Sequence, residues 1–403
     1  MTESASAGVY PPPRPVECPL NPAPLLGELR ERRPVSRVTL WDGRSAWLVT
    51  RHTEVRAALR DSRLSADVNN PAYPFLSQGQ VATRRLLESF IRMDPPEHDR
   101  HRRILVPEFL AKRVEAMRPG IQEVVDRLLD EMIAAGPPAD FVSAFALPLP
   151  SLIICRLLGV PYADHAFFEH HSSVGFNRGS TVDEIYASHR ELTDYLSRLV
   201  AVKAKEPTDD LLSRLVISQE SAGDLTRHEL VNMALILLMA GHETTANMTA
   251  LSVLELLRHP EQRELLRTRP ELIPGAVEEL LRLHSIVQNG LPRVATEDFD
   301  LGGTTIRAGD AVLISLSAAN RDPRAFESPD ELDVERNPRN HVAFGFGIHQ
   351  CIGQPLARLE LQVALATLLR RLPGLRIGDT PPEKLEYRHS MTVFGVYNLP
   401  VTW

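Results

Sequence analysis

The sequence predicts a mainly α-helical fold with small β-sheets. Long segments in the second and third quarters of the chain repeat apolar residues at three- and four-residue spacing, which is typical of amphipathic helices. One of them, residues 228–260, is apolar on nearly all sides, so we expect this helix to run through the middle of the protein. The β-type runs are short and are bounded by turn residues.

Bulk composition excludes several classes of protein. The chain has 403 residues, 43% of them hydrophobic and 24% charged, and a net charge of -7, which argues against nucleic acid as a default partner. Three sparse cysteines (Cys18, Cys155 and Cys351) fit a reducing compartment rather than a disulfide scaffold. The N-terminus has no signal-peptide core, and the apolar run Ala234 to Ala240 is too short to cross a bilayer. We therefore expect a monomeric cytoplasmic protein without a membrane segment.

The chain has one predicted boundary. Residues 1–15 are small and Pro-rich and predict a disordered arm. Residues 16–403 contain no Gly/Ser linker, charge block or fixed-period repeat, which predicts a single domain.

The elements follow in order along this domain. Val38 to Thr50 holds two β-type runs around Asp42-Gly43, a strong hairpin signal, and an irregular stretch follows at Ser65 to Gln80. Helical periodicity then dominates until short β-type pieces return in the last quarter. The helical stretches are 108–135, 194–205 and 228–260, and the β-type pieces are 301–314 and 390–403.

The loop FGFGIHQCIG, Phe344 to Gly353, raises the question of what Cys351 does. It is a buried structural cysteine, a nucleophile beside His349, or a metal thiolate. Zinc would require further ligands at short spacing, and no CxxC motif is present. A single thiolate suits haem iron, since glycines admit a flat ligand and the helical run 354–372 places its N-terminus, with Pro355 in the first turn, beside the sulfur. Haem ligation is the interpretation that uses every feature of the loop.

This loop resembles the haem-binding signature FxxGxxxCxG of the cytochrome P450 monooxygenases. The resemblance extends from about Val16 to Trp403, with the soluble actinobacterial enzymes as the nearest type. It implies the cytochrome P450 fold, with haem b buried between the long central helix and the cysteine loop. It also implies Cys351 as the iron ligand, and Phe344, Gly345 and Gly353 as residues that shape the cofactor site.

The central helix contains AGHETTAN, which is unusual inside an apolar segment. A solvated helix end or a packing notch is one interpretation, because an ionised Glu is expensive to bury. A zinc-protease motif is excluded, because Ala246 stands where the second histidine is required. The stretch resembles the oxygen-activation segment AGx(D/E)TT of the same family. The resemblance implies that Gly241 leaves room for dioxygen and opens the helix, that Thr244 holds the oxygen, that Glu243 passes protons, and that Thr245 shares the role of Thr244.

Four basic residues are candidates for the two haem propionates. His98 and Arg102 are four residues apart and share a helix face, Arg293 lies in an extended segment, and His349 precedes the cysteine by two residues. Each alone is more often a surface residue. The resemblance implies that all four bind the propionates.

Arg100 and Arg103 flank this set, and we expect them to face solvent or a partner. With Arg102 they form a local basic patch on an acidic chain. In the resembled family such a patch receives an acidic ferredoxin.

Glu279 and Arg282, three residues apart, form a surface ion pair or the family's ExxR element. The resemblance implies Arg336 as the third member and a scaffolding role for all three. The histidines at 165, 170 and 171 match no standard metal-site spacing, and we interpret them as side chains of a solvated helix.

The substrate pocket is expected to be largely apolar. By resemblance it is lined by five side chains, Leu238, Val287, Met391, Val393 and Phe394. The implied reaction is hydroxylation or epoxidation of an apolar small molecule, such as a secondary metabolite or xenobiotic, by dioxygen. Because no flavin or iron–sulfur motif occurs in these 403 residues, we expect electrons from a ferredoxin and its reductase. A haem-thiolate sensor or a peroxygenase is the alternative, and the Glu243-Thr244 pair favours the monooxygenase over both.

Overall fold

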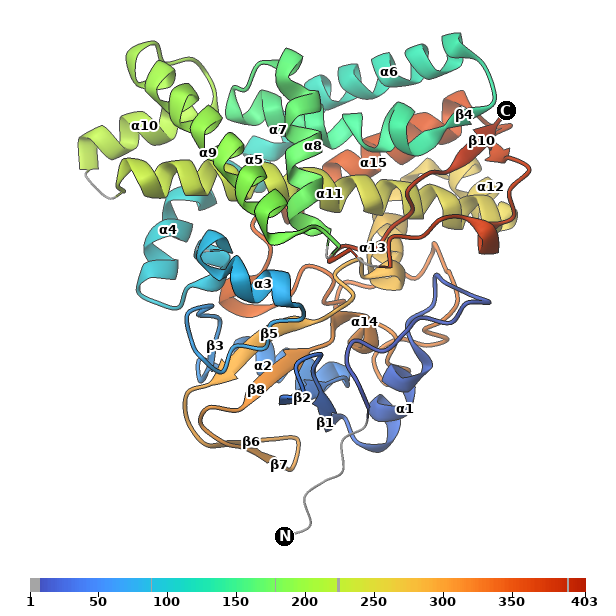
Figure 1. The fold of residues 1–403 in the computed structure, drawn as a ribbon. Coiled ribbons are helices and arrows are strands. Elements are labelled where there is room, and N and C mark those ends of the chain that lie inside the picture. The colour runs from blue at the N-terminus through green and yellow to red at the C-terminus, as the bar shows by residue number, and fades with distance from the viewer. Residues whose placement is uncertain (1–7, 88, 178, 223–224, 390) are drawn as a thin grey trace. The chain divides into compact units, whose positions relative to one another are not determined.

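The computed structural model describes residues 8–87, 89–177, 179–222, 225–389 and 391–403. The chain forms two compact units, each drawn in Figure 1. Unit 1 comprises Met1–Leu87, Ile91–Asp94 and Pro274–Cys351, and unit 2 comprises Glu88–Phe90, Pro95–Ile273 and Ile352–Trp403.

Unit 1 is built on a five-stranded sheet with the order β1-β2-β8-β5-β3. The hairpin expected around Asp42-Gly43 is confirmed. Strands β1 (Val35–Thr39) and β2 (Ser45–Val49) pair antiparallel, with Val35 opposite Val49. Gly43 has a φ of +83°, a conformation that a side chain would disfavour. The hairpin begins three residues earlier than expected.

Strands β5 to β8 come from the expected β-type region and from the segment just before it, whereas β3 lies at the start of the stretch expected to be irregular. Strand β8 pairs parallel with β2 and antiparallel with β5, and β5 pairs antiparallel with β3. A separate hairpin is formed by β6 and β7. The bounds are β3 Leu64–Ser65, β5 Leu291–Ala295, β6 Phe299–Leu301, β7 Thr304–Ile306 and β8 Ala311–Ile314.

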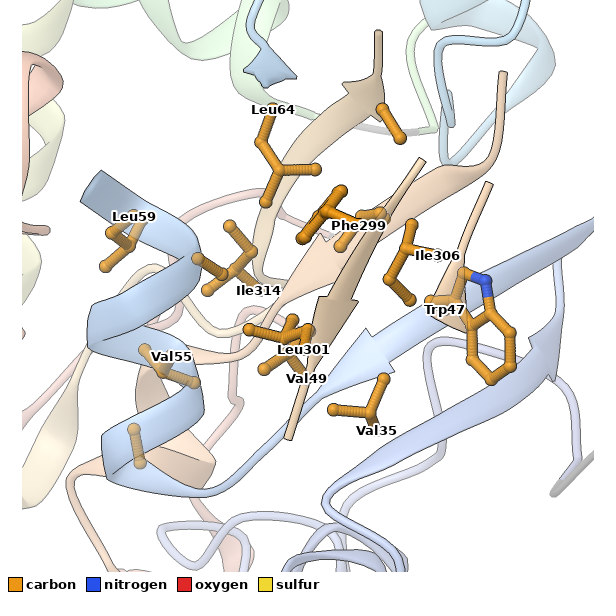
Figure 2. Close-up of a cluster of buried hydrophobic side chains, with 14 of the residues drawn as sticks. Val35, Trp47, Val49, Val55, Leu59, Leu64, Phe299, Leu301, Ile306 and Ile314 are labelled. Atoms are coloured by element: carbon orange, nitrogen blue, oxygen red, sulfur yellow. The ribbon is translucent and has the colours of Figure 1, made fainter. Parts of the chain in front are cut away.

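One face of this sheet packs on α2 (His52–Arg60). Figure 2 shows Val55 and Leu59 of the helix beside Ile314, with Leu301 and Phe299 of the separate hairpin in the same cluster. All five are buried. The other helices of this unit are α1 Pro24–Arg32, α3 Gln78–Ala82, α14 Leu316–Ala319 and, from Pro274 onward, α13 Ile273–His284.

Ordered backbone begins before the boundary expected at Pro15. Val9 forms a parallel bridge with Thr39, and Tyr10 donates its backbone N–H to Thr39 O at 2.8 Å. Tyr10 is 2% exposed in an apolar cluster. These residues are therefore fixed by a free strand edge and by burial, which a Pro-rich composition does not reveal, and residues 1–7 of the expected arm lie outside the described residues.

Unit 2 is organised around α11 (Arg227–Arg258), the long apolar helix expected from the sequence. A capping box of Thr226 and Glu229 fixes its first turn. The helix packs against α7, α8, α9 and α15, as Figure 1 shows. The bounds of these and the remaining helices are α4 Glu97–Leu105, α5 Ala111–Glu115, α6 Arg118–Ala135, α7 Pro148–Leu158, α8 His165–Phe176, α9 Val182–Lys205, α10 Leu211–Ala222, α12 Pro260–Thr268 and α15 Gln354–Arg371.

Two expectations for unit 2 change in detail. The helical stretch 108–135 is divided between α5 and α6, because Pro119 lies in the first turn of α6, where its missing N–H is tolerated. In the described part of the tail the one strand is β10 (Pro400–Thr402), which pairs with β4 (Ala139–Asp140) and β9 (Arg376–Ile377). Met391 and Val396 add isolated β-bridges. Earlier in the tail the chain runs through turns, and Ser390 lies outside the described residues. Among the described helices, none has the length and apolar character required to cross a membrane.

Candidate functional site

The cysteine loop lies at the end of unit 1. Cys351 follows a short 3₁₀ helix, Gly347–His349, and donates its backbone N–H to Phe344 O at 2.9 Å. Cys351 is exposed and is not in a disulfide. Helix α15 begins three residues later at Gln354, with Gly353 as its N-cap. By contrast, burial together with nearby carboxylates raises the pKa of the Cys155 thiol to about 12, so Cys155 stays protonated and is a poor metal ligand.

Glycines give this loop its shape. Gly345 and Gly347 have φ values of +70° and +77°, which favour glycine over other residues. A Cβ at Gly347 would lie 2.4 Å from Leu59 O, so no larger residue fits there without a backbone shift. The loop also lies close to β5, because a Cβ at Gly345 would be 3.8 Å from Leu291 Cδ1.

Arg293 in β5 is a buried charged side chain of unit 1. It is 6% exposed, and its Nη1 donates to Pro292 O at 2.8 Å. Among the described residues no carboxylate lies within salt-bridge distance of it. Burial lowers the pKa of the Arg293 guanidinium, an effect partly opposed by Tyr73 and Asp94, yet an arginine remains charged in proteins. The fold therefore holds a buried cation that lacks an anionic partner.

The remaining propionate candidates are divided between the units. His349 ends the 3₁₀ helix of the cysteine loop and is half-buried. His98 and Arg102 lie one turn apart on α4 in unit 2, where His98 is 1% exposed and Arg102 is half-buried. The Nδ1 atom of His98 lies 2.8 Å from Asp99 Oδ1.

The stretch AGHETTAN, residues 240–247, lies in the middle of α11. Most of this helix is buried, but Ala240 is exposed and Thr244, one turn later, is half-exposed, whereas Thr245 is buried. The Thr244 hydroxyl donates to Ala240 O at 2.6 Å. The expected opening of the helix at Gly241 is not seen in this structure, where α11 is continuous. The missing side chain instead lets α7 approach closely, because a Cβ at Gly241 would lie 3.1 Å from Ile154 Cδ1.

Glu243 is 1% exposed, so the solvated-helix-end interpretation does not apply to it. Its carboxylate pairs with Arg388 at 2.8 Å. Asn247, one turn along α11, donates to Glu243 Oε2 at 3.2 Å and to Glu243 O at 2.7 Å. Sequence reasoning missed Arg388, since no local pattern links it to a helix 145 positions earlier. The four-residue spacing of Glu243 and Asn247 was a usable signal for the second contact.

These residues fit a haem group. In unit 1 an exposed thiol follows a glycine-shaped loop, and a buried guanidinium that has no carboxylate partner among the described residues matches a propionate. In the largely buried middle of α11 in unit 2, Ala240 is exposed and Thr244 is half-exposed.

Glu279, Arg282 and Arg336 are brought together in unit 1. Arg282 donates two bonds to Glu279, at 2.7 and 2.8 Å, and Arg336 Nη1 donates to Glu279 Oε1 at 2.8 Å. Glu279 and Arg282 are both fully buried, so the alternative of a surface ion pair is wrong. Arg282 also donates to the carbonyls of Asn320 and Pro329. It thereby ties three segments of unit 1 together.

The expected pocket residues are apolar and mostly buried. Leu238, Met391, Val393 and Phe394 in unit 2 are each at most 3% exposed, and Val287 in unit 1 is half-buried. The ring of Phe394 stacks on that of Tyr387 at 5.8 Å.

The basic patch differs from its expected form. Arg100 was expected to face solvent or a partner, but it donates to Glu229 Oε1 and is therefore tied to the first turn of α11. Burial alone would raise the pKa of Glu229, but the bonds from Arg100, Thr226 and His101 lower it well below its ordinary value. Arg103 is exposed, as expected. The sequence pattern gave no sign of the contact between α4 and α11.

The histidine group on α8 has ordinary helix surroundings. His171 Nδ1 lies 3.1 Å from Ser188 Oγ, and burial lowers the pKa of its imidazole. His170 is exposed.

A family model described as cytochrome P450 matches residues 160–390. The chain is 52% identical to cytochrome P450-SU2 of Streptomyces griseolus, covering 100% of this chain and 98% of that protein. It is 53% identical to pentalenic acid synthase of Streptomyces avermitilis, covering 96% of this chain and 95% of that protein.

A solved structure shows the same fold. The mycinamicin VIII C21 methyl hydroxylase of Micromonospora griseorubida, bound to mycinamicin VIII, superposes with a TM-score of 0.92 at 43% identity, covering 98% of this chain and all of that chain. The chain belongs to the cytochrome P450 family. It is a bacterial P450 monooxygenase of the actinobacterial type, and its cofactor is haem with a cysteine thiolate on the iron.

Proposed function

We propose that Cys351 is the thiolate ligand of the haem iron and that Arg293, His349, His98 and Arg102 bind the propionates. When bound, the haem supplies the activation of dioxygen. The support is the exposed Cys351 thiol together with the buried Arg293 guanidinium. Phe344, Gly345 and Gly353 would hold the loop around the thiolate, and Glu279, Arg282 and Arg336 would serve as its scaffold.

The Glu243-Thr244 pair is the observation that carries the oxygenase role of this site. Oxygen activation needs protons delivered one at a time, while free access of water would waste the reducing equivalents. Glu243 is buried and the next residue, Thr244, is half-exposed beside Ala240. A carboxylate followed by a hydroxyl moves a proton without an open water channel. A sensor would not need this pair, and a peroxygenase, which uses peroxide directly, would often lack it.

The substrate in this proposal is an apolar small molecule of the secondary-metabolite type, hydroxylated or epoxidised at a carbon. Leu238, Val287, Met391, Val393 and Phe394 offer apolar side chains for such a pocket. Relatives of this chain have names that refer to pentalenic acid, vitamin D3 and mycinamicin VIII. The test is a panel of terpenoid, steroid and macrolide compounds scored by the spin-state shift of the holoenzyme. Shifts for several apolar compounds support the proposal; shifts only for small polar compounds contradict it.

We propose a ferredoxin and its reductase as the electron donors, in the cytoplasm. Exposed Arg103 and half-buried Arg102 lie on α4 beside a surface hollow of about 430 Å³ lined in part by Arg100 and Ile104. Positive charge there suits an acidic partner. Arg103→Glu should slow ferredoxin-driven reduction about tenfold at low salt, while Lys384→Glu, an exposed control on the same unit, should not. Equal rates in both variants would contradict the docking site, and turnover by peroxide alone would favour the peroxygenase.

A further inference from the structure

A buried polar cluster surrounds Glu243. Arg388 Nη1 donates to Glu243 Oε2 at 2.8 Å and to Asn247 Oδ1 at 3.1 Å. The side chains of Arg388 and Glu243 are 9% and 2% exposed. Asn247 closes the cluster by donating Nδ2 to the same Oε2 at 3.2 Å. All three residues belong to unit 2.

The turn that carries Arg388 is fixed closely against α11. Arg388 donates its backbone N–H to Gly395 O at 2.9 Å, and Met391 donates its own to Arg388 O at 3.2 Å. A Cβ at Gly395 would lie 1.7 Å from Asn247 Oδ1. Only glycine permits this approach of backbone to helix. The guanidinium is therefore aimed at Glu243 by the backbone of its own turn.

The two carboxylate oxygens of Glu243 have different surroundings. Both protein donors, Arg388 Nη1 and Asn247 Nδ2, go to Oε2. Among the described residues Oε1 accepts no hydrogen bond. The cluster thus holds one oxygen in place and leaves the other without a hydrogen bond from a described residue.

Stability alone gives little reason for this ion pair. Removing an arginine and a carboxylate from water costs about as much as their attraction returns, and apolar residues of similar size often serve as well. Glu243 also lies next to Thr244, the half-exposed hydroxyl of the proposed relay. A functional requirement for a carboxylate at this buried position would explain why the protein bears the desolvation cost of the pair.

We propose that Arg388 is a positioning residue for proton delivery, assisted by Asn247. It holds Oε2 of Glu243 by a hydrogen bond and leaves Oε1 as the atom that exchanges protons. Oε1 takes a proton from a hydronium ion, which leaves as a water molecule, and passes the same proton toward the Thr244 hydroxyl. The carboxylate returns to its ionised form, and no electron moves through it. This inference rests on the proposed relay role of Glu243.

The test compares Arg388→Gln, Arg388→Lys and Glu243→Gln in the holoenzyme. One readout is the infrared carboxyl stretch of the ferrous carbon monoxide form, and the other is peroxide released per electron pair consumed. In Arg388→Gln we expect a protonated-carboxyl band that disappears in the double variant with Glu243→Gln. Peroxide release should rise about tenfold or more relative to product. Arg388→Lys keeps the charge and should restore both readouts in part.

The control variant is Lys203→Gln, which breaks another buried ion pair of unit 2, with Asp210. It should lower thermal stability as Arg388→Gln does, without added peroxide, and any new carboxyl band should come from Asp210 and persist in the double variant with Glu243→Gln. If Arg388→Gln does not retain haem, Asn247→Ala replaces it, with a smaller rise in peroxide expected.

Two contrary outcomes are distinguishable. Wild-type infrared and peroxide behaviour in Arg388→Gln, with Glu243→Gln altered in both, would overturn the positioning role and leave the relay in place. Wild-type coupling in Glu243→Gln would overturn the relay role itself, and the positioning role with it.

Discussion

Thr244 and Thr245 are adjacent on α11 but have different surroundings. Thr244 is half-exposed and donates to Ala240 O at 2.6 Å, whereas Thr245 is 5% exposed. A hydroxyl that serves a relay must reach the reacting oxygen, so this difference in exposure favours Thr244.

We therefore predict that Thr244→Ala retains haem but diverts most electrons to peroxide, whereas Thr244→Ser stays coupled. Thr245→Ala should release much less peroxide. The measurement is peroxide and product formed per NAD(P)H consumed. Strong uncoupling in Thr245→Ala, with coupled turnover in Thr244→Ala, would exchange the two roles.

Arg293 is a buried guanidinium that lacks a carboxylate partner among the described residues. A charge-assisted hydrogen bond is worth about 1.5–3 kcal/mol, so Arg293→Leu should weaken haem binding about ten- to hundredfold. Arg293→Lys should have a smaller effect, because it keeps the charge but not the planar fork. The rate of haem loss to an excess of a high-affinity haem scavenger measures this.

The same substitution has an opposite effect on the haem-free protein. Because an unpaired buried cation is unfavourable, the Arg293→Leu apoprotein should unfold at a higher temperature than the wild-type apoprotein. Unchanged haem retention together with an unchanged apoprotein midpoint would contradict the account of Arg293.

At the scale of elements, sequence patterns predicted the helices and turns that local interactions determine. The hairpin of β1 and β2 follows from Asp42-Gly43, and α11 follows from its apolar periodicity and capping box. Pro119 indicates the division between α5 and α6, but the apolar spacing on both sides of it predicted one continuous helix. Burial of single polar groups was not predictable, since it depends on which other elements cover them.

Glu360 on α15 illustrates such a group and predicts a pH dependence. Burial raises the pKa of its carboxyl from 4.5 to about 8 in the folded protein, and its Oε2 has no hydrogen-bond partner among the described residues. Between about pH 4.5 and 8 the folded state retains a proton that the unfolded state has lost. The contribution of Glu360 to the free energy of unfolding therefore falls as pH rises through this window and levels off above it.

Glu360→Gln should remove this slope. Each tenfold difference in the proton equilibrium corresponds to about 1.4 kcal/mol, so the variant should gain up to several kcal/mol relative to wild type by pH 8 and little at pH 4.5. Urea unfolding across this range measures it, with exposed Glu383→Gln as the control. Parallel curves for wild type and Glu360→Gln would contradict the burial argument.

At the scale of the whole molecule, the single domain expected for residues 16–403 stays a prediction. The chain forms two compact units, and each draws on separate stretches of sequence. If these units fold as one domain, calorimetry of the holoprotein should show one transition whose calorimetric and van't Hoff enthalpies agree. Two separable transitions would mean two folding units.

The candidate site shows the same limit of sequence reasoning at larger scale. The motifs at 344–353 and 240–247 are contiguous, and the residues in them were identified from type and spacing. Arg388 was missed because its role depends on a tertiary contact with Glu243. Arg100 was expected to face solvent or a partner. Its bond to Glu229 was not predictable, because it links segments 129 positions apart.

The central claim is that Cys351 ligates the haem iron as a thiolate. The most direct measurement is the carbon monoxide difference spectrum of the reduced, purified protein, with Cys351→Ala as the variant and Cys18→Ala and Cys155→Ala as controls. The account predicts the long-wavelength Soret band of a thiolate-ligated haem in wild type and in both controls, and its loss in Cys351→Ala. A band at the histidine-ligated position in wild type, or an unchanged band in Cys351→Ala, would contradict it.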